Sequence, residues 1–171
     1  MVLVATLAAG VAELTMVAAR STHAARTQSA ATSAAMQRME ELRGLTWAFL
    51  RDASAAPVSD TTTDLSRDPP ANGGGGMTAS PARALEVNTP GYVDYLDAMG
   101  RWVGTAAVAP PGAIYVRRWS ITPLPNDPAD TVCLQVFVTT VASDVGRGPA
   151  TRAAIRTQDD VVLATCRTRS G

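Results

Sequence analysis

The sequence has no lysine, a single histidine and few aromatic residues. All 15 of its basic residues are arginines, 15 acidic residues balance them, and aromatic residues make up 5% of the chain. A nucleic-acid-binding domain normally has a strongly basic face, often with aromatic residues among the basic ones. This sequence contains no such patch, so we expect no nucleic-acid partner.

The scarcity of histidine also excludes most catalytic schemes. His23 has no cysteine or carboxylate three or four residues away on either side, and one imidazole alone cannot build a metal site. A Ser-His-Asp triad would have to use the same residue. The run Gly73–Gly76 lacks the Lys-Ser/Thr that follows the glycines of a phosphate-binding loop. We therefore predict a surface role for His23, no cofactor and no enzymatic activity.

Four aspartates in the second half of the chain carry the oxygen ligands that Ca²⁺ prefers: Asp94, Asp97, Asp127 and Asp130. They do not follow the spacing of an EF-hand loop. Aspartate is common at turns because its side chain accepts hydrogen bonds from the nearby backbone. We interpret all four as turn residues and predict no metal site.

Only two cysteines occur, Cys133 and Cys166, and they form no metal-binding motif. They could form a disulfide if this part of the chain lies outside the cytoplasm. Their separation in the sequence leaves the pairing open.

The one long apolar run is Met1–Ala19, in which Glu13 is the only charge. Its length approaches the ~20 residues of a membrane-spanning helix, but alanine and glycine make it weakly hydrophobic. Its small residues suit close packing against other helices. Glu13 has two interpretations, contact with a neighbouring subunit or exposure to water at the membrane edge. No basic residue precedes Arg20, unlike the start of a signal peptide, although Val17–Ala19 resembles a cleavage site.

Residues 1–45 predict one continuous helix, because they are rich in alanine and free of proline. Near their end, Gln37–Arg43 consists only of residues that favour helix. Gly44 fits a helix C-cap. About 43 residues give a length of about 65 Å, roughly twice the hydrocarbon core of a bilayer. Three apolar residues in the second half are spaced by three and need a cover: Met36, Met39 and Leu42.

The composition changes twice after this helix. Residues 46–89 are rich in proline and glycine and predict an irregular connection. From Pro90 to the end at 171 the pattern predicts an antiparallel sheet. The expected strands are Tyr92–Leu96, Arg101–Val103, Ala113–Leu124, Thr131–Val141, and a closing hairpin of Ala153–Arg156 with Val161–Thr168; Ser143–Pro149 is expected to be a turn or loop.

The strand Thr131–Val141 supplies the expected cover for the helix. Alternation places four apolar residues on one of its faces: Val132, Leu134, Val136 and Val138. Packing this face on the Met36/Met39/Leu42 stripe gives the α+β class, with a long N-terminal helix on a small antiparallel sheet.

Five aromatic residues of the sheet region are interpreted as core or half-buried: Trp102, Trp119, Tyr92, Tyr95 and Tyr115. The alternative is a ligand-binding surface formed by Trp102, Trp119 and Tyr115. Arg117 and Arg118, which directly precede Trp119, could make a cation–π contact with it.

The order of long helix, variable connection and antiparallel sheet resembles type IV minor pilins and the pseudopilins of type II secretion systems. Val2–Leu7 resembles the start of the family helix, and Gln37–Arg43 resembles its end in minor pilins and I-type pseudopilins. Tyr92–Asp97 and Tyr115–Trp119 are similar to segments of minor-pilin-like proteins. The resemblance covers the whole chain in outline.

The resemblance implies a structural subunit that inserts in the inner membrane as a single pass, with its sheet domain in the periplasm or in an extracellular filament. Its partners would be other pilin or pseudopilin subunits, contacted through the helix. The implied assembly residues are Val2, Leu3, Val4, Leu7, Val11, Glu13, Leu14 and Val17.

The sequence departs from the family at its start. The basic leader, the glycine before the cleavage point, the methylated phenylalanine and the glutamate five residues into the mature chain are absent. We expect an upstream start codon to encode them; the alternative is that the processing site has been lost. The alternative function is an exported or membrane-anchored binding module that reads a ligand with its aromatic residues. Cleavage near Ala19 would favour that alternative.

Overall fold

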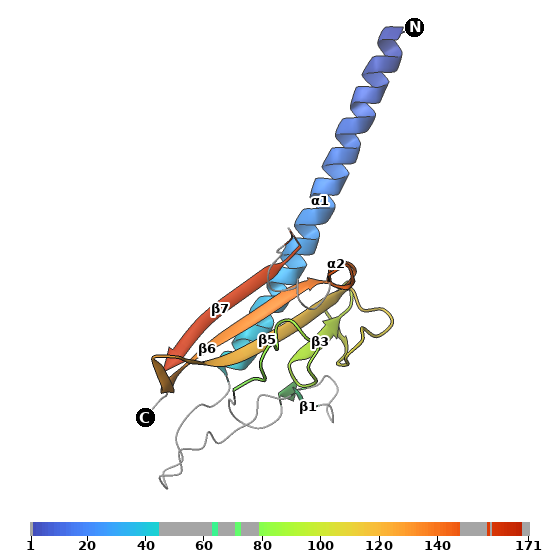
Figure 1. Cartoon of the computed structure of the whole chain (residues 1–171). Helices are drawn as coiled ribbons and strands as arrows, with labels where there is room; N and C mark the ends of the chain where they lie inside the picture. Colours follow the sequence, from blue (N-terminus) through green and yellow to red (C-terminus); the bar gives the residue numbers. More distant parts are fainter. Residues whose placement is uncertain are drawn as a thin grey trace.

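A long helix and an antiparallel sheet make up the fold (Figure 1). The computed structural model describes residues 2–44, 63–64, 71–72, 79–147, 157 and 159–168, with only the backbone at 2–10, 12, 63–64, 71–72 and 129. The elements are α1 (Val2–Arg43), β1 (Thr63–Asp64), β2 (Ala71–Asn72), β3 (Val93–Leu96), β4 (Trp102–Gly104), β5 (Tyr115–Leu124), β6 (Asp127–Thr140), α2 (Val141–Val145) and β7 (Val161–Thr168).

The main sheet has the order β4-β3-β5-β6-β7, and every neighbouring pair is antiparallel. The last third of α1 lies across one face of this sheet, whereas its N-terminal part projects well beyond it (Figure 1). At 42 residues the helix is about 63 Å long. The predicted α+β class is therefore confirmed. Within the part of the chain that the structure describes, no helix is both long and apolar enough to cross a membrane.

The end of α1 follows the sequence prediction. The helix ends at Arg43, and the Gly44 N–H donates to the Glu40 carbonyl oxygen at 2.9 Å. Arg43 also pairs with the Glu40 carboxylate, at 2.9 Å, on the exposed side. Further back, the hydroxyls of Thr22, Thr27 and Thr32 each donate to the carbonyl four residues earlier, which satisfies them within the helix.

The helix–sheet core contains two of the three predicted helical residues. Met39 and Leu42 are buried in one cluster with the predicted β6 face, Val132, Leu134, Val136 and Val138. The prediction for Met36 is wrong, since its side chain is 55% exposed.

A helix turns about 100° per residue, so a spacing of three drifts around the axis, and Met36 lies about 120° from Leu42. The buried face instead continues backward through Ala35 and Ala31, both fully buried. These small side chains bring the α1 backbone close to β6.

The strands form largely where the alternation predicted them. The β3–β4 hairpin turns at Gly100, whose φ of 76° suits glycine. In the expected connection, β1 and β2 form a two-stranded ladder, and Ala84 is buried in the main core. Ala153–Arg156, the first arm of the expected closing hairpin, lies outside the described residues, and its second arm, β7, pairs with β6.

One expected loop begins as a helix. The prediction of a turn or loop over Ser143–Pro149 is wrong at its start, because α2 includes Ser143. Thr140 caps α2, and its hydroxyl accepts a hydrogen bond from the Ser143 N–H at 3.2 Å. The cap redirects the chain at the end of β6.

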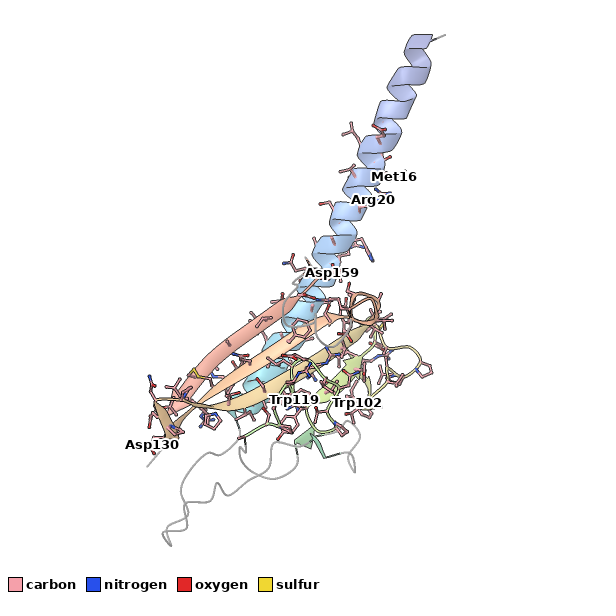
Figure 2. The ribbon with its side chains drawn as sticks, in the orientation of Figure 1. Met16, Arg20, Trp102, Trp119, Asp130 and Asp159 are labelled. Atoms are coloured by element: carbon pink, nitrogen blue, oxygen red, sulfur yellow. A yellow bond between two sulfur atoms is a disulfide. The ribbon has the colours of Figure 1, made fainter. Side chains whose placement is uncertain are left out.

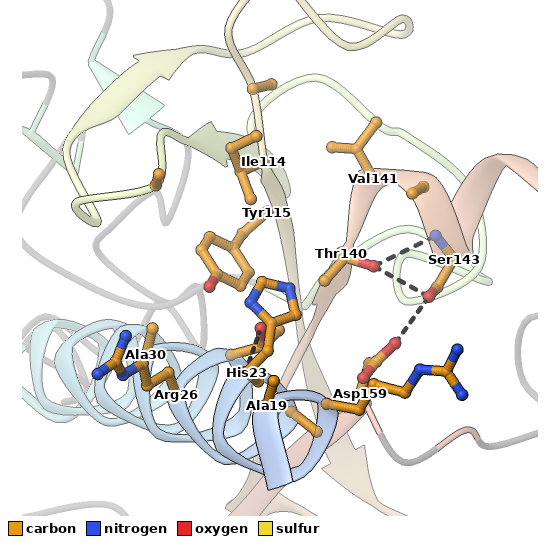
Figure 3. Close-up of a pocket in the computed structure, with 16 residues that line it drawn as sticks. Ala19, His23, Arg26, Ala30, Ile114, Tyr115, Thr140, Val141, Ser143 and Asp159 are labelled. Atoms are coloured by element: carbon orange, nitrogen blue, oxygen red, sulfur yellow. Dashed lines mark hydrogen bonds between the residues drawn. The ribbon is translucent and has the colours of Figure 1, made fainter. Parts of the chain in front are cut away.

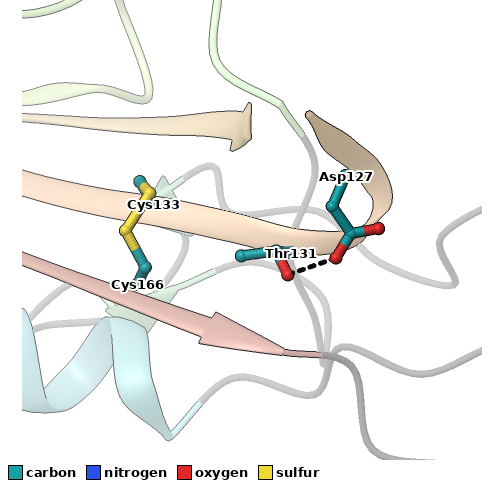
Figure 4. The surroundings of a disulfide bond; sticks show 4 residues. All are labelled: Asp127, Thr131, Cys133 and Cys166. Atoms are coloured by element: carbon teal, nitrogen blue, oxygen red, sulfur yellow. Dashed lines mark hydrogen bonds between the residues drawn. A yellow bond between two sulfur atoms is a disulfide. The ribbon is translucent and has the colours of Figure 1, made fainter. Parts of the chain in front are cut away.

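The two cysteines form a disulfide, which settles the pairing that the sequence left open (Figure 4). Cys133 on β6 and Cys166 on β7 are direct register partners, with Cα atoms 4.0 Å apart. The bond ties the edge strand β7 to its neighbour β6.

Candidate assembly surface

The projecting part of α1 exposes large apolar side chains. Three predicted assembly residues are among them: Val11 is 58% exposed, Leu14 72% and Val17 62%. Met16, labelled in Figure 2, lies on the same projecting part. For the other predicted assembly residues, Val2, Leu3, Val4 and Leu7, only the helical backbone is described.

Helical spacing joins three of the exposed residues into a ridge. Val11, Leu14 and Val17 follow one another at intervals of three, so consecutive members are neighbours on the helix surface, and the row turns by about 120° around the axis from Val11 to Val17. Glu13 is exposed and precedes Val17 by one turn. A carboxylate therefore lies beside the Val17 end of this apolar row. We call Val11, Leu14 and Val17, together with the adjacent Glu13, the apolar ridge.

A groove opens where α1 leaves the sheet (Figure 3). Its volume is about 1260 Å³. Residues 19–30 of α1 form one wall, and the start of β5, the end of β6 and the start of α2 form the other, with Ile114, Tyr115 and Val141 among its side chains. The lining includes six alanines: Ala19, Ala24, Ala30, Ala98, Ala113 and Ala142.

The basic and acidic side chains of the groove are unevenly distributed. Arg20, His23 and Arg26 line its helical wall, and Asp159 lies on the opposite side. Asp159 Oδ2 accepts a hydrogen bond from Ser143 Oγ at 3.0 Å (Figure 3). His23 is exposed, as predicted. The groove therefore combines a small-residue apolar lining with a cationic helical wall.

Arg117 fastens α1 to the sheet. Its guanidinium binds the Asp94 carboxylate through two hydrogen bonds, of 2.9 and 2.7 Å, and donates a third to the Ala34 carbonyl at 2.9 Å. Burial opposes the charge, but the Asp94 carboxylate outweighs it and raises the pKa of Arg117. Arg117 and Asp94 are register partners on β5 and β3, so correct strand alignment would have been needed to find this pair from the sequence.

The predicted cation–π partners of Trp119 are corrected by the structure. Neither Arg117 nor Arg118 takes that place; the Arg38 guanidinium carbon lies 3.6 Å from the centroid of the Trp119 ring. Arg38 also donates to Glu41 Oε2 at 2.7 Å. Burial lowers the pKa of Arg38 despite the opposing effect of Asp94 and Glu41. Arg118 points to the opposite face of β5 from Trp119. Arg117 shares the face of Trp119, but its guanidinium is held by Asp94 and the Ala34 carbonyl.

The aromatic residues behave as core and not as a ligand surface. Trp119 is fully buried, Tyr92, Tyr95 and Tyr115 are buried, and Trp102 is half-buried against the main core. Figure 2 shows Trp119 and Trp102 over the sheet, away from the projecting helix. Trp102, Trp119 and Tyr115 therefore do not form the predicted common ligand surface, since only Tyr115 lines the groove.

Two further arginines hold α2 and the chain around it. Arg118 binds the Asp144 carboxylate at 3.0 and 2.7 Å and the Asn88 side chain. Arg147 binds both oxygens of Asp160, at 2.7 and 2.8 Å. These clamps fix the position of α2 and so that of one groove wall.

The four predicted turn aspartates divide into different roles. Asp97 accepts hydrogen bonds from the backbone N–H groups of Met99 and Arg101, as a turn residue does. Asp127 accepts one from the Thr131 hydroxyl at 2.6 Å (Figure 4). Asp94 is instead a buried ion-pair partner in mid-sheet, so its turn assignment is wrong. Asp127 begins β6 and the exposed Asp130 lies within it, so these two are strand residues and not turn residues. Over the described ranges, no three acidic, cysteine or histidine side chains come together to hold a metal ion.

Comparison with protein-family models, with curated proteins and with solved structures gave no match.

Proposed function

We propose that this protein is a structural subunit of the pilin or pseudopilin kind, which assembles through the projecting part of α1. The observation that carries the proposal is the division of one 42-residue helix into a packed part and a projecting part. Residues 31–42 contribute to the core, whereas Val11, Leu14 and Val17 are exposed. Such an apolar surface marks a site of contact with protein or membrane.

The disulfide supports an extracytoplasmic place for the sheet domain. Disulfides persist in the periplasm and outside the cell, and are rare in the reducing cytoplasm. The Cys133–Cys166 bond is compatible with a sheet domain in the periplasm or in an extracellular filament, with the N-terminal helix in the inner membrane. The partners in this proposal are other subunits of the same filament.

The alternative of an exported binding module is weakened, because neither Trp102 nor Trp119 lines the groove and only Tyr115 does. Its three aromatic ligand-reading residues are buried or half-buried. The groove beside α1 is a binding surface of a different kind, lined by alanines and three basic side chains, and it adjoins the proposed assembly helix.

The N-terminal residue and intact mass of the protein, isolated from its own membranes, test the proposal. We expect a processed chain that begins with a methylated phenylalanine a few residues ahead of Met1. A mature chain beginning near Arg20 would have lost Val11, Leu14 and Val17, and would overturn the proposal. An unprocessed chain recovered only in the soluble fraction would also overturn it.

A further inference from the structure

Two apolar surfaces of this molecule cannot cover each other within one chain. The apolar ridge of α1 and the helical wall of the groove belong to the same continuous helix, at residues 11–17 and 19–30. A rigid helix cannot fold its earlier turns back beside its later ones. Any cover for the groove that comes from this ridge must therefore come from a second copy.

Charge complementarity matches the ridge to the groove. The ridge carries one carboxylate, Glu13, and the helical wall of the groove carries Arg20, His23 and Arg26. Over the residues that the structure describes, Glu13, Arg20 and Arg26 form no ion pair. The one groove carboxylate, Asp159, is hydrogen-bonded to Ser143. A purely apolar occupant would leave the charges of Arg20 and Arg26 unmatched.

The groove wall is also suited to the approach of a helix. Ala19, Ala24 and Ala30 on α1 have small side chains, as do Ala98 and Ala142 opposite. Small residues let a second helix backbone come close, which is the usual composition of a tight helix–helix interface.

We propose that this groove receives the ridge of a second copy of the same chain, with Glu13 of that copy placed against Arg20 and Arg26. This inference rests on the proposed function, because it names the partner of the assembly helix. The ridge and the groove are different surfaces, so the contact is heterologous, and a pair of copies still offers one free ridge and one free groove for further copies. Alignment of residue 13 with residues 20–26 shifts successive copies by about 10–20 Å along the helix.

Engineered thiols test the contact in the full chain in its membranes. Cys133 and Cys166 are joined, so a new cysteine is the only free thiol within the described residues. A chain carrying both Leu14→Cys and Ala142→Cys is expected to give a ladder of oxidised multimers. Two singly substituted chains produced together are expected to give only a heterodimer. Leu14→Cys combined with Met99→Cys is the control, since Met99 is 81% exposed and does not line the groove.

Absence of the heterodimer would overturn the inference. So would Leu14→Cys homodimers in place of it, because they would indicate symmetric pairing of the projecting helices. If the Leu14→Cys and Met99→Cys chains gave as much heterodimer as the Leu14→Cys and Ala142→Cys chains, the cross-link would reflect random collision. That result would also overturn the inference.

Charge reversal provides a second readout in the same chains. Glu13→Arg is expected to lower the yield of the Leu14–Ala142 cross-link about fivefold, the effect of roughly 1 kcal/mol. When Arg20→Glu and Arg26→Glu are added to the chain that carries Glu13→Arg and both cysteines, every copy has the reversed ridge and the reversed groove, and the yield is expected to be restored. Asp130→Arg, a reversal at an exposed site far from the groove, is the matched control and should leave the yield unchanged. Failure of the restoration would overturn the placement of Glu13.

The two proposals fail in distinguishable ways. A processed N-terminus together with no ridge–groove cross-link would overturn this inference and leave the pilin-like function standing. A cross-linked ladder of unprocessed chains outside any membrane or filament would sustain the contact and overturn the function.

Discussion

Arg117 shows how much of the helix–sheet connection depends on single side chains. Its guanidinium is buried between β3, β5 and α1, where it meets the Asp94 carboxylate and the Ala34 carbonyl. Such a pair is costly to break from one side, because the remaining charge stays buried without its partner.

We expect Arg117→Met to lower the free energy of unfolding by about 3–5 kcal/mol. The double variant Arg117→Met, Asp94→Leu is expected to lose less, since it removes both buried charges. Urea unfolding followed by tryptophan fluorescence measures both. A single variant that loses no more than the double variant would contradict the ion-pair argument.

A second single residue, Asp160, influences how the stability of the sheet domain depends on acid. Its side chain is 1% exposed. Burial alone would raise the pKa of its carboxyl, but hydrogen bonds from Arg147, the Thr157 N–H and Thr139 outweigh burial and bring the pKa below its ordinary value of 3.8. Because the folded pKa is the lower one, this carboxylate stabilises the fold above about pH 4, and the contribution disappears as the pH falls through the folded pKa.

We expect Asp160→Asn to lower stability at pH 7 and to flatten the loss of stability between pH 5 and pH 2, both taken as approximate limits. Thermal unfolding across this pH range measures the effect. Asp130→Asn, at an exposed carboxyl, is the control and should follow the pH profile of the parent chain. An unchanged profile in Asp160→Asn would exclude Asp160 as a source of acid sensitivity.

At the scale of elements, α1 offers two methionines three residues apart with opposite environments. Met39 is buried against β6, and Met36 is 55% exposed. Met39→Ala is expected to cost about 2–5 kcal/mol because it leaves a cavity. Met36→Ala is expected to change stability by less than about 0.5 kcal/mol. Chemical denaturation of the two variants compares them directly, and equal losses would contradict the orientation of α1.

The elements themselves were largely predictable, because they rest on local patterns. The continuous helix followed from its alanine content and the Gly44 stop, and β6 followed from the alternation of Val132, Leu134, Val136 and Val138. The rotation of α1 on the sheet was not predictable from methionine and leucine alone, since its buried face is continued by alanines that also occur on the exposed side.

The candidate surface was predictable only in part. The ridge could be read from the sequence, because it depends on spacing within one helix. The groove could not, since its walls come from residues about a hundred positions apart and meet only when α2 turns at Thr140. The Arg117–Asp94 and Arg38–Trp119 contacts likewise depend on the register of strands and on the helix position.

At the scale of the whole molecule, the disulfide is the one covalent link between distant parts of the chain. It closes a loop with a sequence separation of 33 residues. Replacing both Cys133 and Cys166 by serine is expected to lower the free energy of unfolding by about 2–4 kcal/mol. Thermal unfolding with and without a reducing agent measures this. A reducing agent should lower the stability of the parent chain to that of the variant and leave the variant unchanged. If the reducing agent lowered the stability of the variant as well, the effect could not be assigned to the Cys133–Cys166 bond.

The same bond limits how far the molecule can be stretched. If a tensile load acts between α1 and the end of β7, the residues between Cys133 and Cys166 cannot be extended, because the disulfide carries the load past them. An extended chain spans about 3.4 Å per residue, so the disulfide shortens the maximum extension of the unfolded chain by about 110 Å. A subunit carrying force along a fibre would thus keep most of β6 and β7 in place after its other contacts had yielded.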